Sequence, residues 1–213
     1  MKLKLHDTLL VLFNLFPLAL VLDGTWRPFD MMAFYWLELV VIGGFAVAAL
    51  LLAAFYKLSQ RRIASAISDI AGSVFFSLHF GFFIVMLGFI VGSYLPEGTE
   101  TRALTDPLVP AQMVLEHATL TNILPMVFSW QMFVFITGYI VPRQYAVDHP
   151  RIMLHAYKNL FVLFISGFVG IMAAMATHSL LWGACLLAVV KTLVAYASAQ
   201  IKADEEQKKE TAP

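Results

Sequence analysis

Six apolar stretches alternate with polar segments along the chain, and each is close to the length that crosses a bilayer. A spanning helix needs about 20 apolar residues, because each residue advances it by about 1.5 Å across a hydrocarbon core of about 30 Å. The pattern therefore predicts an all-α protein, a single-domain bundle of six transmembrane helices. We expect the spans at residues 5–22, 31–56, 68–95, 123–141, 157–177 and 180–199.

The third stretch is the one against which we expect the others to pack. It carries a lone histidine, His79, near its middle, and small residues recur every four positions at Ser73, Ser77 and Gly81. Small residues at this spacing share one helix face and let a neighbouring backbone approach closely. The fifth and sixth stretches have similar faces, at Ser166, Gly170 and Ala174 and at Ala184, Ala188 and Thr192.

Two segments lie outside the expected spans. Residues 96–122 form the longest connection, and the apolar spacing after Pro110 predicts a short amphipathic helix lying on the outer membrane surface. Residues 200–213 are charged and have few apolar side chains to bury, so we expect a disordered tail.

The distribution of Lys and Arg predicts the orientation of the spans. Cytoplasmic loops of membrane proteins carry an excess of these residues. With six spans and the N-terminus in the cytoplasm, the external segments hold only Arg27 and Arg102. The cytoplasmic segments hold Lys2, Lys4, Lys57, Arg61, Arg62, Arg143, Arg151, Lys158, Lys202, Lys208 and Lys209. Both termini are therefore expected in the cytoplasm.

Composition supports a membrane protein. The chain has 213 residues, of which 60% are hydrophobic and 13% charged, and the charged share is about half that of a soluble domain. The net charge is zero, and no basic run outside the membrane flanks indicates a nucleic-acid partner. The single cysteine, Cys185, cannot form an internal disulfide and is interpreted as a packing residue.

Glu38 and His79 are the candidates for an intramembrane site. An acid within a span costs about 2.5–3.5 kcal/mol on insertion scales, so it normally faces the bundle interior and has a partner. One interpretation is a Glu38/His79 pair that carries a proton or binds a metal ion. The other is a protonated Glu38 bonded to a serine or tryptophan, with a neutral His79 satisfied by backbone. The two residues differ in expected depth by about 10 Å, so direct contact is not required by the sequence.

Further polar residues lie within or beside the spans. Lys191 either extends its ammonium to the cytoplasmic face or forms an ion pair with Asp69, which is expected at a similar depth. Gln131, Ser129 and Asn14 are candidates for hydrogen bonds between helices.

A basic cluster is expected on the cytoplasmic side at Arg151 and His155, together with His149. It is interpreted either as a contact with lipid headgroups or a partner, or as a solvated face. The chain has no HExxH, GxSxG, P-loop or CxxC motif, so the sequence favours a protein that is not an enzyme.

Three short motifs occur in one order along residues 31–200. They are Trp36 two residues before Glu38, the His-aromatic-Gly motif of residues 79–81, and the PxRxxxLH-like segment Pro150-Arg151-Ile152-Met153-Leu154-His155. In these motifs the chain resembles an uncharacterised family, a domain of unknown function, of bacterial multi-pass inner-membrane proteins. The chain departs from that family's pattern at Leu87, where the resemblance implies a second histidine, and at Ser129-Trp130, where it implies a Ser-His pair.

Two functions remain open from the sequence. The first is a transporter- or sensor-like membrane protein of the bacterial inner membrane, whose Glu38 and His79 bind a proton or cation. Its cofactor is left open by the sequence, and a metal ion is one candidate. The second is a structural subunit without its own chemistry, whose small-residue faces dock a second copy or a membrane partner protein.

Overall fold

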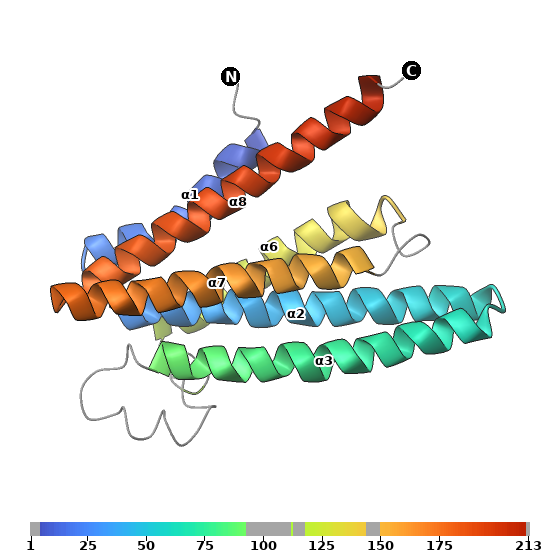
Figure 1. The fold of residues 1–213 in the computed structure, drawn as a ribbon, viewed down its shortest axis with the longest axis horizontal. Coiled ribbons are helices and arrows are strands. Elements are labelled where there is room, and N and C mark those ends of the chain that lie inside the picture. Colours follow the sequence, from blue (N-terminus) through green and yellow to red (C-terminus); the bar gives the residue numbers. More distant parts are fainter. Residues whose placement is uncertain (1–4, 93–111, 113–117, 144–149, 212–213) are drawn as a thin grey trace. The chain divides into compact units, whose positions relative to one another are not determined.

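The computed structural model describes residues 5–92, 112, 118–143 and 150–211, and its elements within these ranges are helices (Figure 1). In chain order they are α1 (Leu5–Leu22), α2 (Pro28–Ser59), α3 (Ile63–Gly92), α6 (Ala118–Phe135), the π-helix η1 (Ile136–Ile140), α7 (Pro150–Thr177) and α8 (Leu180–Thr211). The expected all-α class is confirmed for this part of the chain.

Three segments are long and apolar enough to cross a membrane by themselves. They are Pro28–Ser59, Ile63–Phe89 and Ala156–Thr177. Three shorter apolar segments accompany them, at Val11–Leu22, Leu124–Ile140 and Leu180–Val194. Length and composition therefore suggest insertion into a membrane, and the count of six spans stays a prediction.

α2 begins at Pro28, three residues before the expected span, and two local features favour that start. Proline suits the first turn of a helix because its missing N–H has no intrahelical partner there. Asp30 accepts hydrogen bonds from the backbone N–H of Arg27 at 2.8 Å and from the Arg27 guanidinium. An acid three residues into a helix that reaches back in this way stabilises the first turn.

α8 continues to Thr211, so a helix occupies most of the tail that we expected to be disordered. The expectation rested on the lack of apolar residues and overlooked helix propensity. Residues 203–209 are mainly Ala, Glu, Gln and Lys, and acidic residues stand four positions before lysines. Both features favour a helix without a buried face.

α6 begins at Ala118, within the segment that we expected to be the external loop. The rest of that loop lies outside the described residues apart from Gln112, as does the short amphipathic helix expected after Pro110. α6 passes into η1, where the backbone N–H of Val141 donates to Ile136 five residues earlier. Single π turns of this kind are frequent at functional sites.

The helices form two compact units, of which the first contains residues 1–31 and 162–213. In this unit α1 and α8 lie side by side (Figure 1). The two segments after residue 162 approach closely, because a Cβ built on Gly183 would lie 2.5 Å from the carbonyl oxygen of Gly170. Ser166, Ala184 and Ala188 are fully buried, so these small-residue faces are covered within the chain.

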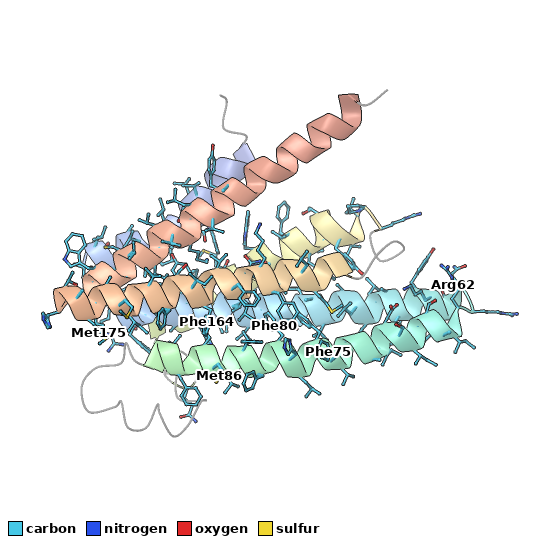
Figure 2. The ribbon with its side chains drawn as sticks, viewed as in Figure 1. Arg62, Phe75, Phe80, Met86, Phe164 and Met175 are labelled. Atoms are coloured by element: carbon cyan, nitrogen blue, oxygen red, sulfur yellow. The ribbon has the colours of Figure 1, made fainter. Side chains whose placement is uncertain are left out.

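The second unit contains residues 32–161 and is built on the antiparallel hairpin of α2 and α3 (Figure 1). Near the open end of the hairpin, the indole N–H of Trp36 donates to the carbonyl of Ile84 at 3.0 Å. Near the closed end, Lys57 lies against Asp69. In between, the Phe80 ring, labelled in Figure 2, occupies the space beside Gly43.

The other helices of this unit add to the hairpin with defined directions. α6 and η1 run parallel to α2, since Gln131 reaches Glu38 and Tyr139 reaches Ala49. The start of α7 runs parallel to α3, since Tyr157 reaches His79 and Phe161 reaches Phe83. The unit therefore consists of two pairs of parallel helices, with opposite directions in α2 and α3.

Candidate functional site

Glu38 is a buried acid on the longest apolar helix of the second unit. Its exposed fraction is 8%, and the side-chain amide of Gln131 donates to its Oε1 at 3.4 Å. This bond is long for an N–H···O pair, which peaks near 3.0 Å. Glu38 and Gln131 come from α2 and α6, so two helices far apart in sequence position the site.

The surroundings of Glu38 are aromatic and packed. Tyr35, one turn earlier on α2, is fully buried, and Trp36 is 7% exposed. In the sequence, Tyr35 and Trp36 lie near the start of the expected span 31–56, a position typical of the aromatic belt at a membrane interface. The structure instead buries both in the core. The indole N–H, the only donor of the Trp36 side chain, is hydrogen-bonded to the carbonyl of Ile84.

His79 belongs to a different cluster. Its Nδ1 lies 2.7 Å from the hydroxyl of Tyr157 on α7, and the His79 side chain is exposed. Its ring stacks on Phe75 with centroids 5.3 Å apart and meets the ring of Phe83 edge-on at 5.2 Å. Phe75 is labelled on α3 in Figure 2.

Glu38 contacts Gln131 and His79 contacts Tyr157, and both interpretations drawn from the sequence stay predictions. Two contacts give the alignment of α2 and α3: Trp36 bonds to Ile84, and Gly43 lies against Phe80. His79 is therefore near the level of Gly43 along the hairpin axis. Glu38 lies five residues earlier on α2, which is about 8 Å along the helix axis. The two residues occupy different levels of the hairpin, as their positions in the sequence indicate.

No group of three His, Cys, Asp or Glu side chains lies close enough to hold a metal ion within the part of the chain that the structure describes. Glu38 and His79, the ligands of the metal interpretation, each have a neutral hydrogen-bond partner there: the Gln131 amide and the Tyr157 hydroxyl. The geometry at Glu38 is that of a single carboxyl group beside an amide.

Asp69 and Lys191 each have a polar partner within their own unit of the chain. The ammonium of Lys57 lies 3.0 Å from Oδ2 and 3.2 Å from Oδ1 of Asp69. Lys191 donates to the side-chain oxygen of Asn14 at 2.8 Å, which links α8 to α1. Each of the two residues thus has a contact within its own unit of the chain, and the ion pair between Lys191 and Asp69 stays a prediction.

The remaining candidates from the sequence are Ser129, Arg151 and His155, and the structure gives none of them a described contact with Glu38 or His79. Ser129 is exposed on α6, two residues before Gln131. Arg151 and His155 lie in the first turns of α7, and their side chains are outside the described residues.

Tyr157 and Lys57 are the partners that sequence reasoning missed. Both stand near helix ends, where Tyr and Lys are common for other reasons. A signal existed for Lys57, because it lies twelve residues before Asp69 and the two flank the polar turn at Gln60-Arg61-Arg62. In an antiparallel hairpin, residues on either side of the turn face each other.

Comparisons with known proteins give a family but no activity. No curated protein and no solved structure matches the chain. One family model, described as a family of unknown function, matches residues 1–212. The chain, whose buried acid and helical hairpin are described above, belongs to this family of unknown function, DUF6498.

Proposed function

We propose that the chain is a multi-pass protein of a bacterial inner membrane, with Glu38 as the proton-binding group of a transporter- or sensor-like site. The observation that carries the proposal is the contact between Glu38 and Gln131 on two packed helices. A buried acid in an apolar helix is costly, and such residues are a recognised mark of proton and ion pathways in membranes.

The chemistry of the pair suits a proton better than a metal ion. A glutamine amide has both an N–H₂ donor and a carbonyl acceptor. It can therefore donate to a carboxylate and, after rotation, accept from a carboxylic acid, so Glu38 keeps a partner in both protonation states. Transition metals take three or four protein ligands, whereas a proton needs only the one carboxyl group.

The helix directions support a multi-pass arrangement. A chain that crosses a membrane repeatedly gives the second and fourth spans one direction and the third and fifth spans the other. In the second unit α2 and α6 are parallel, as are α3 and the start of α7. This agrees with the alternating directions that the six-span topology gives to its second, third, fourth and fifth spans.

Infrared titration of the protein in lipid nanodiscs tests the proton site. The wild type should show a protonated carboxyl band that changes with pH, and Glu38→Gln should remove it. Gln131→Leu should shift its frequency, because the amide partner is lost. Asp23→Asn, an exposed acid between α1 and α2, is the control and should leave the band intact. Identical titrating bands in the wild type and Glu38→Gln would overturn the proposal.

A structural subunit is the second candidate, and one observation favours it. The small-residue face of α3 is only partly covered, since Ser77 is exposed and a Cβ on Gly81 would meet nothing within 4 Å. A docked helix could use that face. In this case Gly81→Leu should abolish self-association measured by analytical ultracentrifugation in detergent, while Glu38→Gln should leave it unchanged.

A further inference from the structure

His79 presents a polar ring to the surface in the middle of an apolar helix. Its hydrogen bond to Tyr157 uses Nδ1. Among the described residues, the other ring nitrogen, Nε2, has no hydrogen-bond partner. A polar group without a partner in the hydrocarbon region costs several kcal/mol, so a lipid-facing imidazole favours binding of a molecule that supplies one.

The depth of His79 limits what that molecule is. His79 lies ten residues before the end of the apolar segment Ile63–Phe89 and sixteen after its start. At 1.5 Å per residue, the nearer end is about 15 Å away. The headgroups and ester carbonyls of phospholipids lie at the interface, so the partner must carry its polar group within the hydrocarbon interior.

The surroundings of the imidazole favour a flat ring. Phe75 stacks on His79 with an interplanar angle of 13° and is 62% exposed. Phe83 meets His79 edge-on, and Phe161, which is 51% exposed, continues the aromatic surface from α7. Aromatic side chains attract planar rings through stacked and edge-on contacts.

The direction of the hydrogen bond between Tyr157 and Nδ1 decides the hydrogen-bonding character of the exposed nitrogen, and the proposal takes the phenol as the donor. When the Tyr157 hydroxyl donates to Nδ1, the imidazole proton resides on Nε2, which then acts as a donor towards the surface. A donor at this point binds a carbonyl oxygen.

We propose that His79 and Tyr157, with Phe75 and Phe83, form a binding site for a membrane-dissolved molecule with a planar, carbonyl-bearing ring. This is the chemistry of a quinone headgroup. The site lies on α3 and α7, at a different level from Glu38, and it depends on membrane insertion but not on proton binding by Glu38. The proposal concerns binding, and no electron transfer is assigned to it.

Retention of decylubiquinone by the protein in phosphatidylcholine nanodiscs tests the site, with empty nanodiscs as the measure of simple partitioning. The wild type should retain saturable quinone above that level. His79→Leu should weaken binding about tenfold, which corresponds to the loss of one hydrogen bond to a polar group. His79→Gln, which keeps a donor, should recover part of it, and Tyr157→Phe should give an intermediate loss.

Two controls separate this site from others. Leu78→Ala changes a neighbouring side chain that is 72% exposed and should bind like the wild type. Glu38→Gln should also retain quinone, whatever its effect on the infrared titration. Equal retention by the wild type and His79→Leu would overturn the proposal. A second result would also overturn it: a wild type that forms a dimer, retains no quinone above simple partitioning, and becomes monomeric on His79→Leu. In that case a second copy of the chain would cover His79.

Discussion

The ammonium of Lys57 and the carboxylate of Asp69 lie 3.0 Å apart, with side-chain exposures of 15% and 5%. The two residues come from opposite sides of the turn that joins α2 to α3, so the ion pair fixes the register of the hairpin on which the second unit is built. A charge pair this deeply buried is sensitive to loss of one partner, because the remaining charge stays in a poorly solvating environment.

Removal of one member of this pair should destabilise the protein strongly. For Lys57→Met or Asp69→Leu we expect a loss of about 3–5 kcal/mol in the free energy of unfolding, since each leaves an uncompensated buried charge. Unfolding in mixed detergent micelles, followed by circular dichroism, measures this loss.

The double variant Lys57→Met/Asp69→Leu is the matched control, since it removes both charges and keeps apolar volume. It should recover most of the lost stability. If the stability losses of the two single variants simply added in the double variant, the two charges would not interact, contrary to this expectation.

Gly43 should be intolerant of any side chain, in contrast to its neighbour. A Cβ at Gly43 would overlap the Phe80 ring, whereas a Cβ at Gly44 would meet nothing within 4 Å. Gly43→Ala should therefore cost about 1–3 kcal/mol through overpacking. Gly44→Ala should be neutral or slightly stabilising, because alanine favours the helix over glycine by about 1 kcal/mol.

The same unfolding assay compares the two alanine variants. Phe80→Leu in the Gly43→Ala background should restore part of the stability, since the smaller side chain makes room for the new methyl group. Equal stability of Gly43→Ala and Gly44→Ala would contradict the close approach of α2 and α3.

Helical class followed from the sequence because apolar runs of about 20 residues leave few alternatives. A membrane-inserted chain must satisfy its backbone hydrogen bonds internally, so such runs form helices whatever their neighbours are. The ends of helices that extend beyond the apolar region were harder to predict from the sequence. α8 continues through a charged tail because local propensity, which hydropathy does not register, decides the end of a solvated helix.

The partners of polar residues were the least predictable part of the candidate site. Glu38 was identifiable because an acid in an apolar run is rare, but its contact with Gln131 spans 93 residues and depends on which helices are neighbours. His79 was likewise identifiable, whereas its contact with Tyr157 required knowing that α3 and α7 are adjacent. Sequence order alone leaves several helix arrangements open.

The contact between Lys191 and Asn14 should stabilise the packing of α1 against α8. Asn14 is 7% exposed, and its side-chain oxygen accepts from the lysine ammonium at 2.8 Å. Asn14→Leu should lower the free energy of unfolding by about 1–2 kcal/mol. This value lies between the average energy of a hydrogen bond in a membrane and that of a hydrogen bond to a charged group. Asn14→Asp, which offers a carboxylate to the same ammonium, should be at least as stable as the wild type.

A double-mutant cycle with Lys191→Met isolates this interaction. Asn14→Leu should cost much less in the Lys191→Met background, because the ammonium that needs the acceptor is absent. An unchanged cost in both backgrounds would mean that Asn14 stabilises the protein through packing rather than through Lys191.

Asp23 provides a pH-dependent contact in the turn between α1 and α2. Hydrogen bonds from the Thr25 side chain and backbone, the latter at 2.8 Å, lower the pKa of Asp23 below its ordinary value of 3.8. The folded-state pKa is therefore below the unfolded one. The ionised carboxylate stabilises the turn at pH values above 3.8, and this contribution disappears as pH falls through the folded-state pKa.

Carboxyl carbon NMR of protein labelled at aspartate measures this titration, with Asp23→Asn to assign the signal. In the wild type the midpoint should lie below 3.8. Thr25→Val removes the hydroxyl, which is the largest cause of the shift, and keeps the backbone N–H. The midpoint should therefore rise towards the ordinary value without reaching it, because the backbone bond still favours the ionised form. A midpoint that is the same in Thr25→Val and the wild type would rule out the hydroxyl as the cause.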